Sequence, residues 1–364
     1  ALPILADIFD AKVLDGLVGN HAIGHVRYST SGGSIIKNAQ PFTVETRRGH
    51  LAVAHNGNLV NAESLRIQLE QQGDLFFTTT DTEVIAHLLA KAPGKDMVER
   101  FGQVMPQIKG AYSVLLLAGD TMLAARDPQG FRPLILGKRG DSWVVGSETC
   151  ALNLIEAEFV RDIEPGELIR ITPDGVESFF PLKETPAEDV KQCIFELIYF
   201  ARPDSSIFGR SVYDIRKKFG AKLAVELNVE NADCVIPVPD SGVVAAMAYS
   251  EKAGIPFEMG LIRNHYVGRT FIEPAQSIRH FGVRLKLNPV RDLIKGKSLV
   301  VVDDSIVRAT TSKKIIAMLR SAGAKEVHMR ISCPPIMWPC YYGIDTPERS
   351  QLIAASQSVD EIAK

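Results

Sequence analysis

In one segment of the sequence, the types and the order of the residues suit the binding of a phosphorylated sugar. Residues 299–302 are apolar, the acids Asp303 and Asp304 follow, and residues 310–312 are Thr-Thr-Ser. Carboxylates after a strand can hold Mg²⁺ and accept hydrogen bonds from ribose hydroxyls. Hydroxyls and backbone N–H groups at a helix N-terminus favour a phosphate. For a lone Asp-Asp pair, the alternative is a buried strand that ends in an acidic, capped turn.

A parallel sheet would position these residues. The second part of the chain alternates between helices and strands, which we expect at 212–227, 242–253 and 312–321 (helices) and at 232–240, 298–304 and 326–332 (strands). Such alternation predicts an α/β domain with a parallel sheet and crossover helices. Ligands bind beyond the carboxyl ends of such strands, so the two acids would lie at the binding edge.

The first part of the chain is richer in strands. We expect helices at 62–71 and 82–92, and strands at 22–30, 50–55, 111–119, 121–127 and 142–148. Residues 172–190 are polar and rich in proline, which is typical of a passage between domains. We therefore predict two domains, 1–185 and 186–364.

Composition limits the class of protein. The chain has 364 residues, of which 46% are hydrophobic and 23% charged, and its net charge is −2. The length fits two globular domains, and the balanced charge argues against a nucleic-acid or membrane partner. The longest apolar runs are far shorter than the roughly 18 residues that span a bilayer. Five cysteines without close spacing argue against a zinc site or a disulfide framework, so we expect an intracellular protein.

The acidic segment resembles the phosphoribosyl pyrophosphate (PRPP) signature of type I phosphoribosyltransferases. Its surroundings narrow the resemblance to glutamine PRPP amidotransferases, because VPDSG at 238–242 resembles their pyrophosphate loop. The resemblance implies that Asp303 and Asp304 bind ribose and Mg²⁺, and that Asp240 and Ser241 lie near pyrophosphate, with Ser241 also near Mg²⁺. The residues implied for the 5′-phosphate loop are Ser305, Arg308, Ala309, Thr310, Thr311 and Ser312.

Residues 262–288 resemble the loop that closes over PRPP in this family. This stretch carries Arg269, Arg279, Arg284 and Lys286, interleaved with glycines. Such a loop could supply cations to a leaving pyrophosphate. The resemblance implies that Tyr266, Arg269 and Ile272 form part of an ammonia path. Taken alone, the stretch is also typical of a solvated basic loop.

Five motifs of the first part follow one another as in the N-terminal-nucleophile (Ntn) glutaminase domain of the same family. They are GHVRYST at 24–30, AHNGNLVN at 54–61, TTTDTEV at 78–84, RDPQGFRPL at 126–134 and SETCAL at 147–152. The implied fold is an α+β Ntn hydrolase domain with four layers, αββα.

The resemblance also assigns residues to glutamine. Asn56 and Gly57 would form the oxyanion hole. Arg27 would bind the glutamine carboxylate, Asp81 would meet its ammonium group, and Thr30 would neighbour the substrate. Taken singly, Asn-Gly is typical of a hairpin turn, and Arg27 of a sheet surface.

Two departures from the family pattern bear on activity. Residue 1 is Ala and the first cysteine is Cys150, whereas the family opens with the cysteine that attacks the glutamine amide. We therefore expect the chain as given to use ammonia at most. Ala309 stands where most members have glycine, whose freedom in φ suits close approach to phosphate, so weaker phosphate binding is expected.

The cysteines carry a further implication. Many members hold a [4Fe–4S] cluster with four cysteines. Cys193 and Cys340 match two of these ligands, and the other two would follow Lys364, so we expect the cluster in a longer parent protein and not in this chain. The remaining cysteines, which we expect to be buried and structural, are Cys150, Cys234 and Cys333.

The resemblance implies an enzyme that transfers ammonia from glutamine to PRPP, giving 5-phosphoribosylamine, pyrophosphate and glutamate at the start of purine synthesis. It also implies purine nucleotide inhibitors, a homodimer or homotetramer, and a cytoplasmic location, or a plastid if the source is a plant. A non-catalytic regulator that binds PRPP or nucleotides on the same fold remains an alternative. A sugar-phosphate amidotransferase is disfavoured, because its acceptor domain would lack VVVDDSIV.

Overall fold

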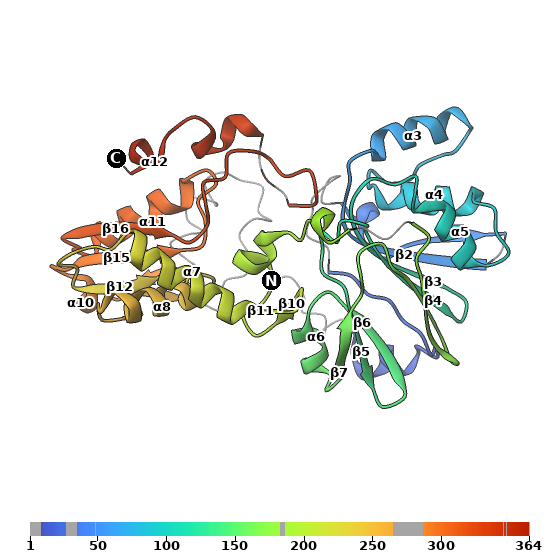
Figure 1. The fold of residues 1–364 in the computed structure, drawn as a ribbon, viewed down its shortest axis with the longest axis horizontal. Coiled ribbons are helices and arrows are strands. Elements are labelled where there is room, and N and C mark those ends of the chain that lie inside the picture. The colour runs from blue at the N-terminus through green and yellow to red at the C-terminus, as the bar shows by residue number, and fades with distance from the viewer. Residues whose placement is uncertain are drawn as a thin grey trace.

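The first half of the chain is built on two antiparallel sheets (Figure 1). The computed structural model describes residues 9–26, 35–47, 49–182, 186–264, 287–344, 346 and 348–363. The larger sheet holds, in spatial order, β1 (Phe42–Thr46), β2 (Gly49–Leu59), β3 (Gly110–Ala118), β4 (Thr121–Arg126), β8 (Leu168–Thr172) and β9 (Gly175–Phe179). The smaller sheet holds β6 (Ser142–Gly146), β5 (Ile135–Arg139) and β7 (Glu158–Asp162). The helices beside them are α3 (Ala62–Gln71), α4 (Thr82–Lys91), α5 (Met97–Val104) and α6 (Thr149–Leu154).

Alternation along β3 explains why the sheets stack. Successive side chains of a strand point to opposite faces. Val114 and Leu116 belong to the core cluster shared with α4 and α5. Leu115 and Leu117 pack into a second cluster, which holds residues of both sheets, and Leu152 of α6 packs against the smaller sheet. The layers are therefore helix, sheet, sheet and helix, which confirms the expected αββα arrangement.

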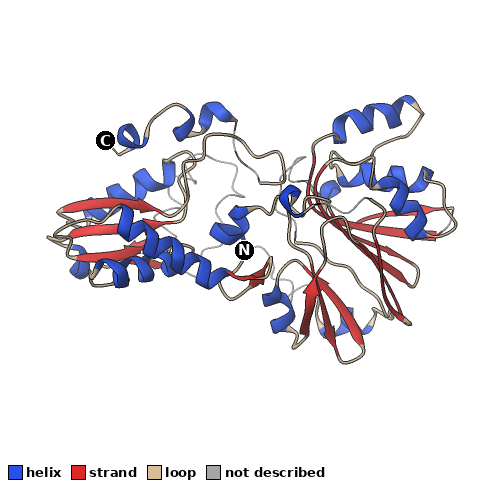
Figure 2. Cartoon of the chain, viewed as in Figure 1, coloured by secondary structure: helices blue, strands red, loops and turns tan. Residues whose placement is uncertain are grey.

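The second half carries a parallel sheet of β12 (Cys234–Pro237), β15 (Ser298–Asp303) and β16 (Glu326–Ile331). Leu299 and Val301 of β15 face the cluster that includes α11 (Thr310–Ser321). Val300 and Val302 face α7 (Val212–Glu226) and α8 (Val243–Ala253). A strand covered on both faces needs a continuous apolar sequence, which explains the run before Asp303. Figure 2 shows the sheet between its helices.

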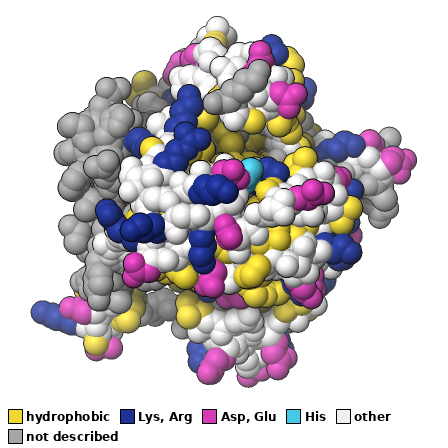
Figure 3. All heavy atoms as spheres, turned by 90° about the vertical axis from the view of Figure 1, so that its left-hand side faces the viewer, with side chains coloured by type: hydrophobic (Ala, Val, Ile, Leu, Met, Phe, Trp, Pro, Cys, Tyr) yellow, Lys and Arg dark blue, Asp and Glu magenta, His cyan; other side chains and the backbone are white. Residues whose placement is uncertain are grey.

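Shorter elements complete the described chain. In the first half they are α2 (Ala11–Asp15) and η1 (Ile36–Asn38). Between the halves and beyond lie η2 (Ala187–Asp189), a π-helical turn η3 (Glu196–Phe200), β10 (Ser206–Ile207), β11 (Arg210–Ser211), β13 (Leu261–Arg263), β14 (Leu287–Pro289), α10 (Arg291–Ile294), η5 (Arg349–Gln351), η6 (Ile353–Ala355) and α12 (Val359–Ile362). Basic and acidic side chains are interspersed on the end face of the second half (Figure 3), in keeping with the small net charge. Within the described ranges, we find no helix with the length and apolar character to cross a membrane.

One sequence prediction about an element was wrong. Residues 22–26 are not a strand, although residues 22–30 were expected to form one, and residues 27–30 lie outside the described chain. Within residues 172–190, which were expected to end one domain and lead to the next, β9 pairs with β8 as an edge strand of the larger sheet. The domain boundary near 185 remains a prediction.

Gly220 of α7 lies at a close contact between α7 and α8. A Cβ atom at Gly220 would collide with the carbonyl of Ala245 and lie 2.8 Å from its Cα. We expect Gly220→Ala to lower the free energy of unfolding by about 1–3 kcal/mol, because overpacking outweighs the gain in helix propensity. The control is Gly102→Ala in α5, where the nearest atom would be 3.4 Å away, and a gain of up to about 1 kcal/mol is expected. Thermal unfolding of both variants measures this, and equal midpoints would contradict it.

Candidate active site

The two acids lie where the parallel sheet brings two loops together. Pro237 of β12 pairs with Val302 of β15, so the loops after both strands leave the same edge of the sheet. Ser241, from the loop after β12, donates its hydroxyl to one carboxylate oxygen of Asp304. The Ser305 hydroxyl donates to the other oxygen at 2.6 Å. The site therefore joins the segment 238–242 to the acidic segment.

Burial makes these acids unusual. Asp303 and Asp304 are 8% and 6% exposed. Burial and the neighbouring Asp304 carboxylate raise the pKa of Asp303 well above its usual range, although its carboxylate accepts the Asp304 N–H at 2.9 Å. Two close carboxylates out of water repel each other, and a bound cation would relieve that repulsion. Asp240 lies nearer the surface and forms an ion pair with Arg263.

The loop after the acids leads into the N-terminus of α11. Thr310 begins this helix, and among the described residues no side chain caps it, so its first N–H groups face outward from the helix end, where an anion could bind. Thr310 and Thr311 are exposed and Ser312 is buried. The C-terminal segment braces the loop: Gln351 accepts a hydrogen bond from Arg308 at 2.9 Å, and the N–H of Ile353 donates to the Val307 carbonyl at 3.0 Å.

Ala309 adopts the backbone conformation that favours glycine. Its φ is 57° and its ψ is 0°, in the left-handed region, and it is buried. An L-residue there costs roughly 1–2 kcal/mol.

We expect Ala309→Gly to raise the affinity for PRPP by about tenfold at most, because the loop reaches its phosphate-binding shape with less strain. Titration of PRPP with Mg²⁺ by calorimetry measures this, with Ala322→Gly, at the right-handed C-cap of α11, as the control. A weaker affinity would contradict it.

Asn56 and Gly57 lie inside β2, not in a hairpin turn. They pair with Ser113 and Tyr112 of β3. Gly57 has a φ of +148°, and a Cβ atom there would collide with the Ala111 carbonyl. The local alternative of a turn is therefore wrong. A glycine is required at position 57 because of its positive φ and because the Ala111 carbonyl leaves no space for a side chain.

Asp81 lies beside this strand. One carboxylate oxygen accepts the Leu59 N–H at 2.9 Å, and the other lies 3.6 Å from Nδ1 of His55. Burial alone would raise the pKa of Asp81, but the His55 imidazole and the Leu59 amide outweigh it and hold that pKa below its usual range. The charged form of Asp81 is therefore stabilised, which suits an ammonium ligand.

Sequence reasoning missed His55 and Glu83. His55 is 4% exposed, and its carbonyl accepts a hydrogen bond from His25 at 3.1 Å. The only local signal was its place directly before Asn56. Glu83 is fully buried and accepts the N–H groups of Phe77 and Thr78 at 2.8 and 2.7 Å, so it fixes the turn that leads to Asp81.

Two domain families match this chain. A glutamine amidotransferase domain matches residues 25–154, and a phosphoribosyl transferase domain matches residues 211–336. Amidophosphoribosyltransferase from Methanocaldococcus jannaschii is 48% identical over 375 residues, which cover 99% of this chain and 79% of that protein. The chain belongs to the amidophosphoribosyltransferase family. The family resemblance and the two-part fold expected from the motifs are thereby confirmed.

Two further relatives match nearly all of this chain, and the chain spans only part of the length of each. Amidophosphoribosyltransferase 1, chloroplastic, from Arabidopsis thaliana is 54% identical, over 99% of this chain and 63% of its own length. The chain thus spans less than two thirds of that relative. The solved glutamine PRPP amidotransferase from B. subtilis, complexed with ADP and GMP, is 49% identical with a TM-score of 0.85, over 93% of this chain and 73% of that one.

Several residues that the family resemblance assigned lie outside the described residues. They are Arg27, Thr30, Tyr266, Arg269, Ile272, Arg279, Arg284 and Lys286. Their roles remain predictions.

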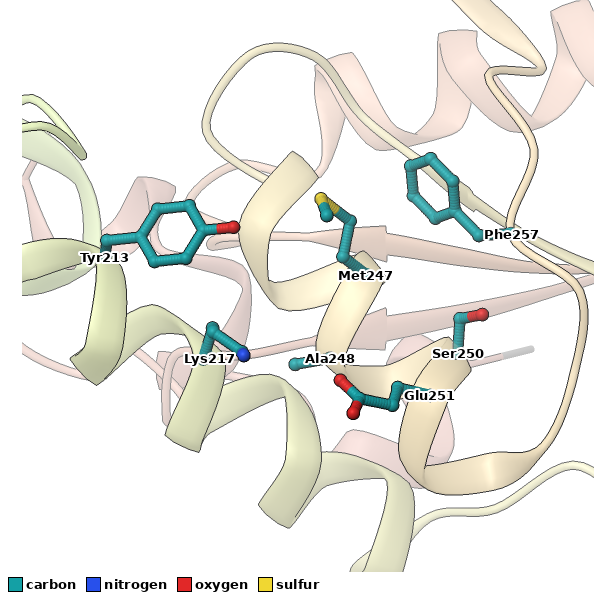
Figure 4. Close-up of a pocket in the computed structure, with 7 residues that line it drawn as sticks. All are labelled: Tyr213, Lys217, Met247, Ala248, Ser250, Glu251 and Phe257. Atoms are coloured by element: carbon teal, nitrogen blue, oxygen red, sulfur yellow. The ribbon is translucent and has the colours of Figure 1, made fainter.

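A groove of about 280 Å³ lies between α7 and α8. Tyr213 and Lys217 of α7 face Met247 and Glu251 of α8 across it (Figure 4). None of the predicted site residues lines this groove.

The cysteines are distributed as follows. Cys234 is buried as expected, but Cys150 and Cys333 are only half-buried, which corrects the prediction for these two. The N–H of Cys193 donates to the Phe131 carbonyl at 3.2 Å, and the Phe131 ring stacks on Tyr342, two residues after Cys340. Both predicted cluster ligands therefore lie in segments that contact Phe131. Among the described residues, no three His, Cys, Asp or Glu side chains gather to hold a metal ion.

Proposed function

We propose that this protein is the glutamine-dependent enzyme that transfers ammonia to C1 of PRPP, giving 5-phosphoribosylamine, pyrophosphate and glutamate at the first committed step of purine synthesis. The proposal rests on the combination of two sites in one chain. The first half matches a glutamine amidotransferase domain. The second half, which matches a phosphoribosyl transferase domain, brings Ser241 and Asp304 into contact beside Asp303, at the ends of parallel strands. Neither half alone supplies both the ammonia donor and its acceptor.

Magnesium fits the acidic site. Mg²⁺ prefers oxygen ligands and is commonly bound by one or two carboxylates together with substrate phosphates, so a larger protein cage is not needed. The buried pair Asp303 and Asp304, with the raised pKa of Asp303, is a donor set that a cation would stabilise. In our proposal Mg²⁺ would neutralise charge on pyrophosphate, with Ser241 beside it, while the acids face the ribose hydroxyls.

The protein's own task at C1 is positioning. The reaction develops positive charge at C1 as pyrophosphate leaves, so the enzyme must place ammonia in line and stabilise the leaving group. The first N–H groups of α11 and the hydroxyls of Thr310 and Thr311 would hold the 5′-phosphate. Asp240, Ser241 and residues of 262–288 would surround pyrophosphate.

In the first half, we propose that Asn56 and Gly57 stabilise the oxyanion and that Asp81 binds the glutamine ammonium group. Hydrolysis also needs a thiol nucleophile, which none of these three residues supplies. Glutamine is the proposed ammonia source.

Four further proposals extend the family resemblance. Cys193 and Cys340 would be two of four ligands of a [4Fe–4S] cluster, and the shared contact with Phe131 supports their common location. Purine nucleotides would bind as inhibitors, because a B. subtilis relative is complexed with ADP and GMP. A homodimer or homotetramer, and a plastid location if the source is a plant, remain proposals; the Arabidopsis relative is named chloroplastic.

The test is release of pyrophosphate from PRPP and Mg²⁺, first with NH₄Cl and then with glutamine. We expect turnover with ammonia, and turnover with glutamine in a form of the protein that carries the thiol nucleophile. No turnover with either, despite PRPP binding, would favour the non-catalytic regulator, for which the left-handed Ala309 is the supporting observation. Turnover with ammonia but none with glutamine in that form would contradict the glutaminase role of the first half.

A further inference from the structure

A short segment of the second half lies on the strand that carries Asn56 and Gly57. We call residues 341–343 the strap. Nδ2 of Asn58 donates to the Tyr341 carbonyl at 2.8 Å, across 283 positions of sequence. Gly343 is so close to β2 that a Cβ atom there would lie 3.0 Å from the Cα of Gly57. The strap therefore touches the backbone of the proposed oxyanion residue itself.

Arg132 fixes the strap in place. Its guanidinium donates to the Gly343 carbonyl and forms an ion pair with Glu196, and both side chains are almost fully buried. The planar fork of arginine can hold two such partners at once, which lysine cannot. Beside it, the Phe131 and Tyr342 rings stack with centroids 4.3 Å apart. Arg132 and Phe131 are consecutive, so one short loop holds the strap through two different contacts.

Gly57 is consequently enclosed from two directions. On one side, the Ala111 carbonyl of β3 leaves no room for a side chain, and on another lies Gly343. Oxyanion donors act because they are held in the required geometry before the reaction begins. A misplacement of about 1 Å can lower a rate by about a hundredfold.

We propose that the strap is a positioning element of the glutaminase site, in which Arg132 holds Gly343 against Gly57 so that the second half sets the geometry of the oxyanion donors. The inference rests on the proposed glutaminase function. Arg132 and Gly343 are positioning residues, since they act through Gly57 and touch no reacting atom. Loosening the strap therefore impairs glutamine hydrolysis and spares the reaction of PRPP with ammonia.

The principal variant is Gly343→Ala, which strains a φ of +102° and pushes the strap away from Gly57. We expect amide hydrogen exchange in residues 56–59 to rise about tenfold. In a form of the protein that hydrolyses glutamine, we expect kcat to fall about 10- to 100-fold, while ammonia-dependent turnover stays within about twofold. Asn58→Ala and Arg132→Lys, which each remove one contact of the strap, should give smaller changes in the same direction, and they carry the test if Gly343→Ala does not fold.

The matched control is Gly323→Ala. It has a similar φ of +97° but lies at the far end of the second half, against the Lys295 side chain. Equal exchange at 56–59 in both glycine variants, or no change in any strap variant, would overturn the proposal. Equal loss of both half reactions would also overturn it, because that marks a general structural role. If the exchange contrast holds but a form of the protein that carries the thiol nucleophile does not hydrolyse glutamine, the proposed function fails and the strap's hold on Gly57 stands.

Discussion

Asp303→Asn is expected to lower ammonia-dependent release of pyrophosphate from PRPP by about 10²- to 10³-fold. The asparagine amide keeps the shape of the side chain. Its oxygen can still accept the Asp304 N–H, which lies 2.9 Å from the Asp303 carboxylate in the unaltered protein, but it has no charge for Mg²⁺. The measurement is kcat/KM for PRPP at saturating Mg²⁺ and ammonia. Asp292→Asn, at an exposed position of α10, is the control and should leave turnover unchanged. Equal turnover by both variants would contradict the role of Asp303.

The same substitution is expected to stabilise the substrate-free protein. Burial and Asp304 raise the pKa of Asp303, so the folded state keeps a proton that the unfolded chain releases. The stability from this group is complete below the unfolded pKa, near 4, and is lost as pH rises through the folded pKa. Asparagine does not ionise and avoids that loss.

Thermal unfolding across pH therefore separates function from stability at this position. We expect the midpoint of Asp303→Asn to exceed that of the unaltered protein at pH 8, and the difference to shrink toward pH 4. Saturating Mg²⁺ and PRPP should reverse the order, because only the carboxylate gains from the cation. A lower midpoint at pH 8 without ligands would show that the two acids do not oppose folding.

Local sequence patterns predicted the elements that carry the acids. The run 299–302 became the buried strand β15, and α3 occupies the expected 62–71. α11 begins at Thr310 and not at 312, because the left-handed Ala309 starts the helix there. The strand and helix themselves depend on neighbours in sequence, through apolar periodicity, and are therefore visible in the sequence alone, whereas the left-handed Ala309 that sets the start of α11 is not.

The contacts that refine the site are not local. Asn56-Gly57 is typical of a hairpin turn, yet β3 pairs with β2 throughout this stretch and keeps it extended. The contact between Arg132 and Gly343 joins residues 211 positions apart. Only tertiary packing decides such pairings, so no period or short motif indicated them. The importance of His55 likewise comes from a tertiary contact, because its ring lies beside the Asp81 carboxylate, which belongs to another element.

Asn56→Ala is expected to lower kcat for glutamine hydrolysis by about 10²- to 10³-fold, as loss of one oxyanion donor does in other acyl transfers. Asn56 is half-buried on β2, where its side-chain amide could donate to the developing oxyanion. The KM for glutamine should change little, because the donor acts on charge that develops only in the transition state. The assay is glutamate formation by a form of the protein that hydrolyses glutamine.

Ammonia-dependent turnover separates a catalytic role of Asn56 from a structural one. If Asn56 acts only on the glutamine oxyanion, then Asn56→Ala should use ammonia as well as the unaltered protein does. Asn153→Ala, at an exposed position of α6, controls for loss of an asparagine in the same domain and should leave both reactions intact. Parallel loss of both reactions would mean that Asn56 supports β2 and not the oxyanion. Undiminished glutamine hydrolysis would place the oxyanion hole elsewhere in the first half.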